Sequence, residues 1–465
     1  MRSDMKVLFS ILLVVVTFTI RTSAFEGPVI TLPYITLEGA YSSEYNITHY
    51  RRIPFAASTA GQNRFRAPQP PLPIKGTYNT DQSFPSCPLA DGSGSEDCLY
   101  LGIYSRPWGR GAKLRPVTVV LHGGAYTAGT ASFNIPPYGY PTLNVSMSND
   151  FVLVYPNYRL GALGFLPGKA IKDAPDAALN PGLLDQQAAL KWVHENIKHF
   201  GGDPEDVAIF GQSAGGGSVI AQVIANGGRT TPRLFQRALA SSPYWLKTYQ
   251  YDDPEAEAIH KEFLNLTGCS EAVKLLDCLR NVDLNTTMTA SSAVNGEWAP
   301  VVDGEFLQDT LSKAVGNKLL NADLVWGMFN TMEGERFVSS DLESPSATPY
   351  NSTEAGFDRW LRDFLPRFSV EQLEAVRKLY PASGVTDTST YNTTYARAGY
   401  VYRDTVLACP AYWSASGARE MSWLGEYTVP PALHVSLLEN GSPKCPFVLK
   451  LPLTWKREVM NRIFA

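Results

Sequence analysis

The residues best suited to chemistry form the pentapeptide Gly211-Gln212-Ser213-Ala214-Gly215, a Gly-x-Ser-x-Gly pattern. A serine in this pattern attacks a carbonyl carbon when a base removes its proton. The pattern is typical of a sharp turn from a strand into a helix, which forces the serine into a strained backbone conformation. The positions two before and two after the serine must then lack Cβ, and Gly211 and Gly215 meet that need. Ser213 is therefore the candidate nucleophile.

A second glycine-rich segment, His122-Gly123-Gly124-Ala125, follows an apolar run upstream of the serine. Attack on a carbonyl creates an oxyanion, and fixed backbone N–H groups stabilise it; loss of one donor typically raises the barrier by about 3 kcal/mol. The segment offers the N–H groups of Gly124 and Ala125, joined by that of Ala214. An ordinary glycine-rich turn has the same composition, so the segment alone is weak evidence. Because it lies upstream of the serine pattern, in the order expected for such enzymes, the two together indicate an oxyanion site.

The Ser213 hydroxyl also needs a base, and with this serine turn the partners follow in the order Ser, acid, His. Four of the six histidines precede Ser213, and His260 leaves only a short segment for an acid, so His434 is the candidate base. Many carboxylates lie between Ser213 and His434. An apolar run at 324–328 predicts a strand, and active sites gather where such strands end. Glu333 follows that run, while Glu335 and Asp323 remain alternatives.

Three buried strands and one helix must position these residues. Apolar, β-branched runs at 117–121, 151–155 and 207–210 predict strands, the last leading directly into the serine turn. Apolar residues spaced three and four apart between 183 and 200 predict a helix that ends at Gly201. This alternation predicts an α/β fold with a mostly parallel central sheet flanked by helices, the α/β-hydrolase arrangement of Gly-x-Ser-x-Gly enzymes. No repeat or linker divides the chain, so we expect one domain over 25–465.

The composition and charge indicate which classes of molecule the protein binds. The chain has 465 residues and a net charge of −4, without a long Lys/Arg run, which argues against nucleic acid and anionic membranes. A small neutral ester is the expected partner, with no stable membrane association; the oligomeric state stays open. No Cys-x-x-Cys or His-x-x-x-His spacing occurs, so we expect no metal, and the chemistry requires no cofactor.

Three features predict export. Residues 1–24 combine Arg2 and Lys6 with an apolar run and a small-residue site, a signal peptide whose run is too short to span a bilayer. Two close cysteine pairs, Cys87 with Cys98 and Cys269 with Cys278, suit short disulfide loops, whereas Cys409 and Cys445 are left open. Asn-x-Ser/Thr sequons predict glycosylation. They lie at Asn46, Asn144, Asn265, Asn285, Asn351, Asn392 and Asn440.

Across residues 50–242 the chain resembles the type-B carboxylesterases, the family of cholinesterases and of secreted fungal esterases and lipases. The resemblance rests on RRIPFA, NRFRAPQPP, SEDCLYLGIY, LHGGAY, NYRLGALGF, NPGLLDQQAALKWV and FGGDPEDVAIFGQSAGGGS, and more weakly on GCSEAVKLLDCLRNV, GMFNTMEGERF, DTVLACP and VPPALH. Within this family, the chain most resembles the secreted fungal carboxylesterases. It implies the roles of nucleophile for Ser213, acid for Glu333 rather than Glu335, and base for His434. It also implies both disulfides and two structural ion pairs, Arg64 with Glu96 and Arg159 with Asp185.

Three departures refine the expectation. Gln212 stands where cholinesterases carry Glu, and the short Cys87–Cys98 loop lacks their choline-binding Trp, which argues against a cholinesterase. Ten residues between those cysteines are too few for the lid of fungal lipases, so we expect an esterase, with a lipase or sterol esterase as the alternative. After His434 the resemblance stops, and we expect a truncated or divergent C-terminal part. An inactive binding or adhesion module of the same fold is the alternative from another class.

Overall fold

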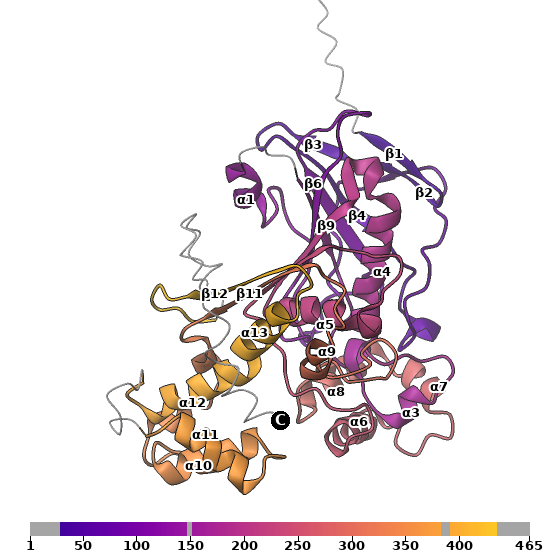
Figure 1. Ribbon diagram of the computed structural model, residues 1–465. Helices are drawn as coiled ribbons and strands as arrows, with labels where there is room; N and C mark the ends of the chain where they lie inside the picture. The colour runs from indigo at the N-terminus through magenta and orange to yellow at the C-terminus, as the bar shows by residue number, and fades with distance from the viewer. Residues whose placement is uncertain (1–27, 147–150, 383–390, 435–465) are drawn as a thin grey trace, which may run out of the picture.

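The structure is a computed structural model that describes residues 28–146, 151–382 and 391–434. Figure 1 shows its strands crossing the middle of the molecule, with the indigo N-terminal strands at one end and the orange helices near residue 370 at the other. The expected signal peptide at 1–24, Asn440, Cys445 and the tail after His434 lie outside the described residues.

A nine-stranded sheet forms the centre of the fold, and its spatial order is β12-β11-β10-β9-β7-β8-β6-β4-β3. The six strands from β12 to β8 are parallel, and the last three run antiparallel to their neighbours. Their bounds are β3 Ala40–Ser42, β4 Ile47–Pro54, β6 Tyr100–Ser105, β7 Arg115–Leu121, β8 Val152–Pro156, β9 Gly202–Gln212, β10 Arg237–Ser241, β11 Leu324–Asn330 and β12 Met421–Tyr427. A smaller sheet joins β1 (Val29–Leu32), β2 (Ile35–Glu38) and β5 (Thr77–Asn79).

Helices cover the sheet. α5 (Ala214–Gly228) packs on β9 and β10, α13 (Cys409–Ser416) packs on β11 and β12, and α4 (Pro181–Asn196) packs beside α5. The others are α1 Tyr140–Val145, α2 Gly161–Phe165, α3 Lys169–Lys172, α6 Pro254–Thr267, α7 Leu275–Asn281, α8 Leu284–Ala293, α9 Leu311–Gly316, α10 Glu354–Phe364, α11 Val370–Leu379 and α12 Thr394–Arg403. Figure 1 shows α10, α11 and α12 grouped beyond the ends of β11 and β12.

The predicted elements are confirmed. The runs at 117–121, 207–210 and 324–328 lie in β7, β9 and β11, and the run at 151–155 lies in β8 except for its first residue. The predicted helix is α4 followed by a 3₁₀ turn, Ile197–Phe200, which ends at Gly201 with φ of 79°. All five residues of β8 are buried, as its continuous apolar run predicts for a strand covered on both faces. The mostly parallel sheet flanked by helices is thus present.

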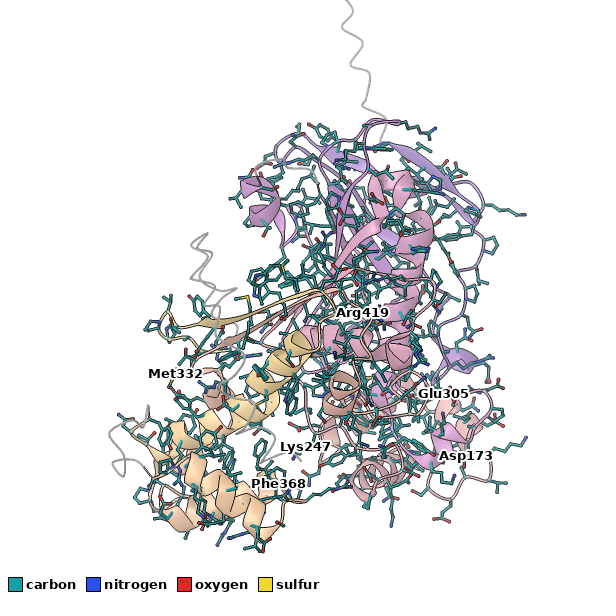
Figure 2. All side chains as sticks on the ribbon, viewed as in Figure 1. Asp173, Lys247, Glu305, Met332, Phe368 and Arg419 are labelled. Atoms are coloured by element: carbon teal, nitrogen blue, oxygen red, sulfur yellow. A yellow bond between two sulfur atoms is a disulfide. The ribbon has the colours of Figure 1, made fainter. Side chains whose placement is uncertain are left out.

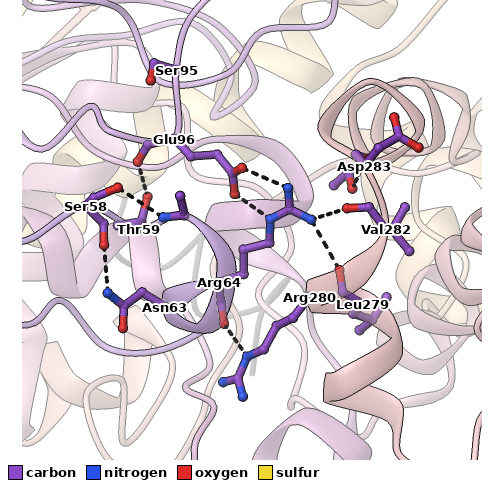
Figure 3. Close-up of polar contacts among 12 residues, drawn as sticks. Ser58, Thr59, Asn63, Arg64, Ser95, Glu96, Leu279, Arg280, Val282 and Asp283 are labelled. Atoms are coloured by element: carbon purple, nitrogen blue, oxygen red, sulfur yellow. Dashed lines mark hydrogen bonds and ion pairs between the residues drawn. The ribbon is translucent and has the colours of Figure 1, made fainter.

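Buried ion pairs join distant parts of the chain. The Arg64 guanidinium donates to both Glu96 carboxylate oxygens, at 2.5 and 2.8 Å, and to the backbone oxygens of Leu279 and Val282 (Figure 3). Arg159 likewise donates to both oxygens of fully buried Asp185, at 2.7 and 2.8 Å. The Arg280 Nε donates to the backbone oxygen of Arg64 at 3.2 Å, and we call the first set, with Arg280, the Arg64 cluster. Disulfides join Cys87 with Cys98 and Cys269 with Cys278, so both loops beside this cluster are covalently closed.

Candidate active site

Ser213 lies at a sharp turn between β9 and α5. Its φ of 58° and ψ of −128° are unfavourable for a residue with a side chain, at a cost on the order of 1–3 kcal/mol. Two backbone hydrogen bonds hold the turn: the Ser213 N–H donates to the Ser241 oxygen at 3.0 Å, and the Tyr244 N–H donates to the Ser213 oxygen at 2.8 Å. The end of the neighbouring strand β10 therefore fixes the serine where β9 terminates.

The flanking glycines are required by close backbone approaches. A Cβ at Gly211 would lie 2.1 Å from the Gly215 oxygen, and a Cβ at Gly215 would lie 2.1 Å from the Leu121 oxygen. Both separations are far below van der Waals contact, and both neighbours are backbone atoms. The turn therefore packs directly against itself and against the end of β7, which explains the spacing seen in the sequence.

Three side chains from three strand ends form one hydrogen-bonded series. The Ser213 Oγ lies 2.8 Å from the His434 Nε2, and the His434 Nδ1 lies 3.0 Å from the Glu333 Oε2. Glu333 is fully buried, and His434 and Ser213 are 6 and 9 % exposed. A carboxylate beside Nδ1 favours the tautomer with its proton on Nδ1, which leaves Nε2 free to accept the serine proton.

Glu333 reaches the site through a short 3₁₀ turn after β11, Glu333–Phe337. Its second oxygen, Oε1, accepts the Asn330 N–H at 2.9 Å, so both carboxylate oxygens are occupied. The alternatives lie elsewhere. Asp323 precedes β11 and pairs with Arg233, and the side chain of Glu335 lies towards Gly399 on α12. Burial raises the pKa of Glu335.

The loop that carries His434 is tied to the loop that carries Glu333. The Asn330 Nδ2 donates to the Leu433 oxygen at 2.7 Å, and the Met332 N–H donates to the Ala432 oxygen at 3.0 Å. Figure 2 shows Met332 where β11 and β12 approach the helices around α12, and the Tyr400 hydroxyl lies 3.4 Å from its sulfur. Asn330 therefore contacts both Glu333, through its N–H, and the segment that carries His434, through its side chain.

The glycine-rich segment after β7 has an unusual backbone. Gly124, Ala125 and Tyr126 all have positive φ, at 115°, 53° and 60°, and the Gly124 oxygen accepts the N–H groups of Thr127 and Ala128. A Cβ at Gly123 would lie 3.2 Å from the Ser213 Cβ, so this segment passes directly beside the serine. Within the described residues, the N–H groups of Gly124, Ala125 and Ala214 donate to no other protein group. They are available to an incoming oxygen.

His122 supports this segment rather than the proton transfer. Burial lowers its pKa to about 4, so the imidazole is neutral at physiological pH. Its neutral Nδ1–H donates to the Gly123 oxygen at 2.9 Å, and its ring stacks on Tyr158 at 4.2 Å between centroids. The Tyr158 hydroxyl donates to the His122 oxygen at 2.6 Å. Two contacts with Tyr158 thus fix His122, the residue that begins the glycine-rich segment.

Two contacts of the site were not foreseen from the sequence. The double contact of Asn330 was one, although a polar residue closing an apolar strand is a signal that could have drawn attention to it. Phe337 was the other: its ring meets the His434 ring edge to face, 4.9 Å between centroids. A lone aromatic residue four positions after Glu333 carries no comparable signal.

Most of the predicted glycosylation positions lie on the surface. The sequon asparagines at 46, 144, 265, 285 and 392 are exposed, and Asn351 is half-buried. Cys409 is buried at the start of α13. Within the described ranges, no helix is long and apolar enough to cross a membrane, and no group of three or more His, Cys, Asp or Glu side chains is placed to hold a metal ion.

The chain is similar to known proteins in sequence and in structure. The sequence profile of the carboxylesterase family matches residues 26–427. Carboxylesterase patB of Aspergillus clavatus is 33 % identical over 359 residues, covering 74 % of this chain and 62 % of that protein. A secreted lipase of Arthroderma benhamiae is 30 % identical, covering 82 % and 70 %. The chain thus spans about two thirds of the length of these relatives.

The solved structure of Aspergillus niger EstA superimposes with a TM-score of 0.74 at 28 % identity, covering 86 % of this chain and 77 % of that one. This similarity, together with the mostly parallel sheet flanked by helices, identifies the architecture described above as the α/β-hydrolase fold.

Proposed function

Since this chain belongs to the carboxylesterase family, we propose that it is a serine esterase that hydrolyses carboxylic esters with Ser213, His434 and Glu333. The observation that supports this most directly is the unbroken series from the Ser213 Oγ to His434, at 2.8 Å, and from His434 to Glu333, at 3.0 Å. A nucleophile, a base and a group that orients the base are the three parts that such catalysis needs.

The proposed reaction proceeds in two halves. The Ser213 Oγ attacks the ester carbonyl while His434 Nε2 takes its proton, and the N–H groups of Gly124, Ala125 and Ala214 bind the oxyanion. The C–O bond to the alcohol then breaks, and His434 returns the proton to the departing alkoxide. In the second half His434 takes a proton from water, the hydroxide attacks the acyl-enzyme, and the acid leaves as Ser213 regains its proton. No cofactor takes part.

The short Cys87–Cys98 loop favours an esterase acting on dissolved esters. The disulfide encloses only ten residues, and a lid able to cover a lipase site needs a longer segment. The alternative is a lipase or sterol esterase, because one of the relatives is named a secreted lipase.

We also propose that the protein is secreted, with residues 1–24 as a removed signal peptide and residues 25–465 as one catalytic unit. Two disulfides suit an oxidising compartment, and the exposed sequons are accessible to glycosylation. Expression in a eukaryotic host tests both points: the medium should contain a protein that begins near residue 25 and loses mass on treatment with an N-glycanase.

The decisive test of the activity is the intact mass of the secreted protein after exposure to a fluorophosphonate, with Ser213→Ala as the control. One label per molecule, lost in Ser213→Ala, is expected, together with turnover of 4-nitrophenyl butyrate. A folded wild-type protein that takes no label would refute the proposal. Activity that rises sharply once tributyrin forms an emulsion would favour the lipase instead.

A further inference from the structure

Tyr126 is the one buried residue of the glycine-rich segment that follows β7. Its side chain is fully buried, whereas every other residue of 122–130 is half-buried or exposed. The hydrophobic effect therefore holds this segment against the core mainly through a single side chain. The two residues before it have no comparable anchor, because Gly124 has no side chain and the side chain of Ala125 is one exposed methyl group.

The backbone around Tyr126 needs such an anchor. Ala125 and Tyr126 have φ of 53° and 60°, in the left-handed region that a residue with a Cβ seldom adopts. Two such residues in succession persist only when the surrounding structure holds them in place. The Tyr126 carbonyl oxygen accepts the Gly161 N–H at 2.7 Å, and its ring packs on Phe165 at 4.9 Å between centroids. Both contacts fix Tyr126 against helix α2.

The end of the Tyr126 side chain reaches helix α5. A Cβ at Gly217 would lie 2.3 Å from the Tyr126 hydroxyl oxygen, so the hydroxyl occupies the space that the glycine leaves open. Helix α5 begins three residues earlier with Ala214, whose N–H is the third proposed oxyanion donor. The side chain of Tyr126 thus connects the segment that carries two donors with the helix that carries the third.

Stabilisation of the oxyanion depends on the distance between these donors. A donor is effective when it lies about 2.7–3.1 Å from the oxyanion, and the loss of one donor lowers kcat by about 10²–10³. We propose that Tyr126 is a positioning residue, whose buried side chain holds the N–H groups of Gly124 and Ala125 at the correct distance from that of Ala214. The inference rests on the proposed esterase function and extends it to a residue that takes no part in the proton transfers.

The test compares an ester with its thionoester, in which sulfur replaces the carbonyl oxygen. Sulfur accepts hydrogen bonds more weakly than oxygen, so correctly placed donors favour the ester. Damage to the rest of the protein lowers the turnover of both substrates alike. The measured quantities are kcat and KM for 4-nitrophenyl butyrate and for its thionoester, in the full-length wild-type protein, Tyr126→Ala and Tyr126→Phe.

In Tyr126→Ala we expect kcat for the ester to fall about tenfold to a hundredfold while KM stays within about threefold, and the ester-to-thionoester ratio of kcat/KM to fall at least about fivefold. Tyr126→Phe keeps the ring, so its kcat and its ratio should return to within about threefold of the wild type. Tyr104→Ala is the matched control, since Tyr104 in β6 is also fully buried and packs on another ring, that of Tyr155, in a separate part of the core. This variant should have a lower melting temperature but the wild-type ratio.

An unchanged ratio in Tyr126→Ala would overturn the inference, and so would an equal fall of the ratio in Tyr104→Ala. If Tyr126→Ala does not fold, Tyr126→Leu decides: its side chain is too short to reach Gly217, so a ratio below that of the wild type is expected, and the wild-type ratio would overturn the inference. A folded wild-type protein without turnover or labelling refutes the esterase proposal itself. An active wild type whose Tyr126 variants keep the ratio refutes only the role of Tyr126.

Discussion

Replacing Glu333 by glutamine should inactivate the protein by reversing the imidazole tautomer. Glu333 is fully buried, and its Oε1 accepts the Asn330 N–H at 2.9 Å while its Oε2 faces the His434 Nδ1 at 3.0 Å. In Glu333→Gln the single amide oxygen is needed by the Asn330 N–H, so the NH₂ group faces Nδ1. Nδ1 then becomes an acceptor, the ring proton moves to Nε2, and the Ser213 hydroxyl loses its base.

The expected loss of kcat is large because the imidazole proton would then lie on Nε2, the nitrogen that must accept the Ser213 proton. The shape of the site is expected to stay intact. A comparable carboxylate-to-amide change in serine hydrolases lowers kcat by about 10⁴, which corresponds to about 5 kcal/mol at 1.36 kcal/mol per tenfold change. The assay is kcat/KM for 4-nitrophenyl butyrate at pH 8, with the far-UV circular dichroism and the melting temperature recorded for each variant.

Glu335→Gln is the matched control, since Glu335 lies two residues away and its side chain is directed towards Gly399. It should retain activity within about threefold. The reasoning is refuted if Glu333→Gln keeps more than a tenth of the wild-type kcat/KM, or if the two variants lose activity equally, because the acid would then not be Glu333.

Three more predictions concern the packing of the serine turn, a buried ion pair and the pH dependence of stability. Gly215→Ala should abolish activity, because its Cβ would lie 2.1 Å from the Leu121 oxygen, whereas Gly109→Ala meets nothing within 4 Å and should match the wild type in turnover. Asp185→Ala should cost about 3–5 kcal/mol of unfolding free energy in urea, because it leaves the buried Arg159 guanidinium without its carboxylate; Asp173→Ala, at an exposed pair with Lys169, should change it by less than about 0.5 kcal/mol. His122 has a folded pKa of about 4, below the ordinary value of 6.5, so the unfolded chain binds the extra proton between these values and stability falls as the pH drops from about 6.5 towards 4, by at most about 3 kcal/mol. His122→Gln should lack this part of the pH dependence in urea titrations at pH 7 and pH 5, and an identical dependence in both proteins would exclude His122 as its source.

The nucleophile turn could be located from the sequence because its requirements are local. Gly211 and Gly215 stand within two residues of Ser213, and the clashes that exclude a side chain arise inside the turn and at the adjacent end of β7. The strands were predictable for the same reason: a continuous β-branched run such as the one in β8 has few other stable environments. A local rule, the place just after a buried strand, favoured Glu333 but left Glu335 and Asp323 as alternatives, and only the family resemblance implied Glu333 rather than Glu335.

The contacts that complete the site could not be predicted. Asn330 and Leu433, whose contact joins the two loops, are 103 residues apart in the chain. Their meeting depends on where loops settle after the sheet has formed, and neither residue type signals its partner. The antiparallel edge of β3, β4 and β6 was likewise missed, because strand direction is set by pairing across the sheet and not by the residues of one strand.

The Arg64 cluster has a consequence for the kinetics of folding. Arg64 meets Leu279 and Val282 across separations of 215 and 218 residues, whereas the two disulfides nearby close loops whose cysteines are only 11 and 9 residues apart. Closing a long loop costs more chain entropy than closing a short one, and contacts of high sequence separation slow the search for the native state. Both disulfides can therefore form by oxidation while the chain is still largely unfolded, whereas the contacts of the Arg64 guanidinium with Leu279 and Val282 can form only after these distant parts of the chain have come together. A chain arrested before that step would carry its correct disulfides but leave the side chain of Arg64 exposed. Trypsin would then cleave the arrested chain after Arg64, whereas in the native protein this residue is buried.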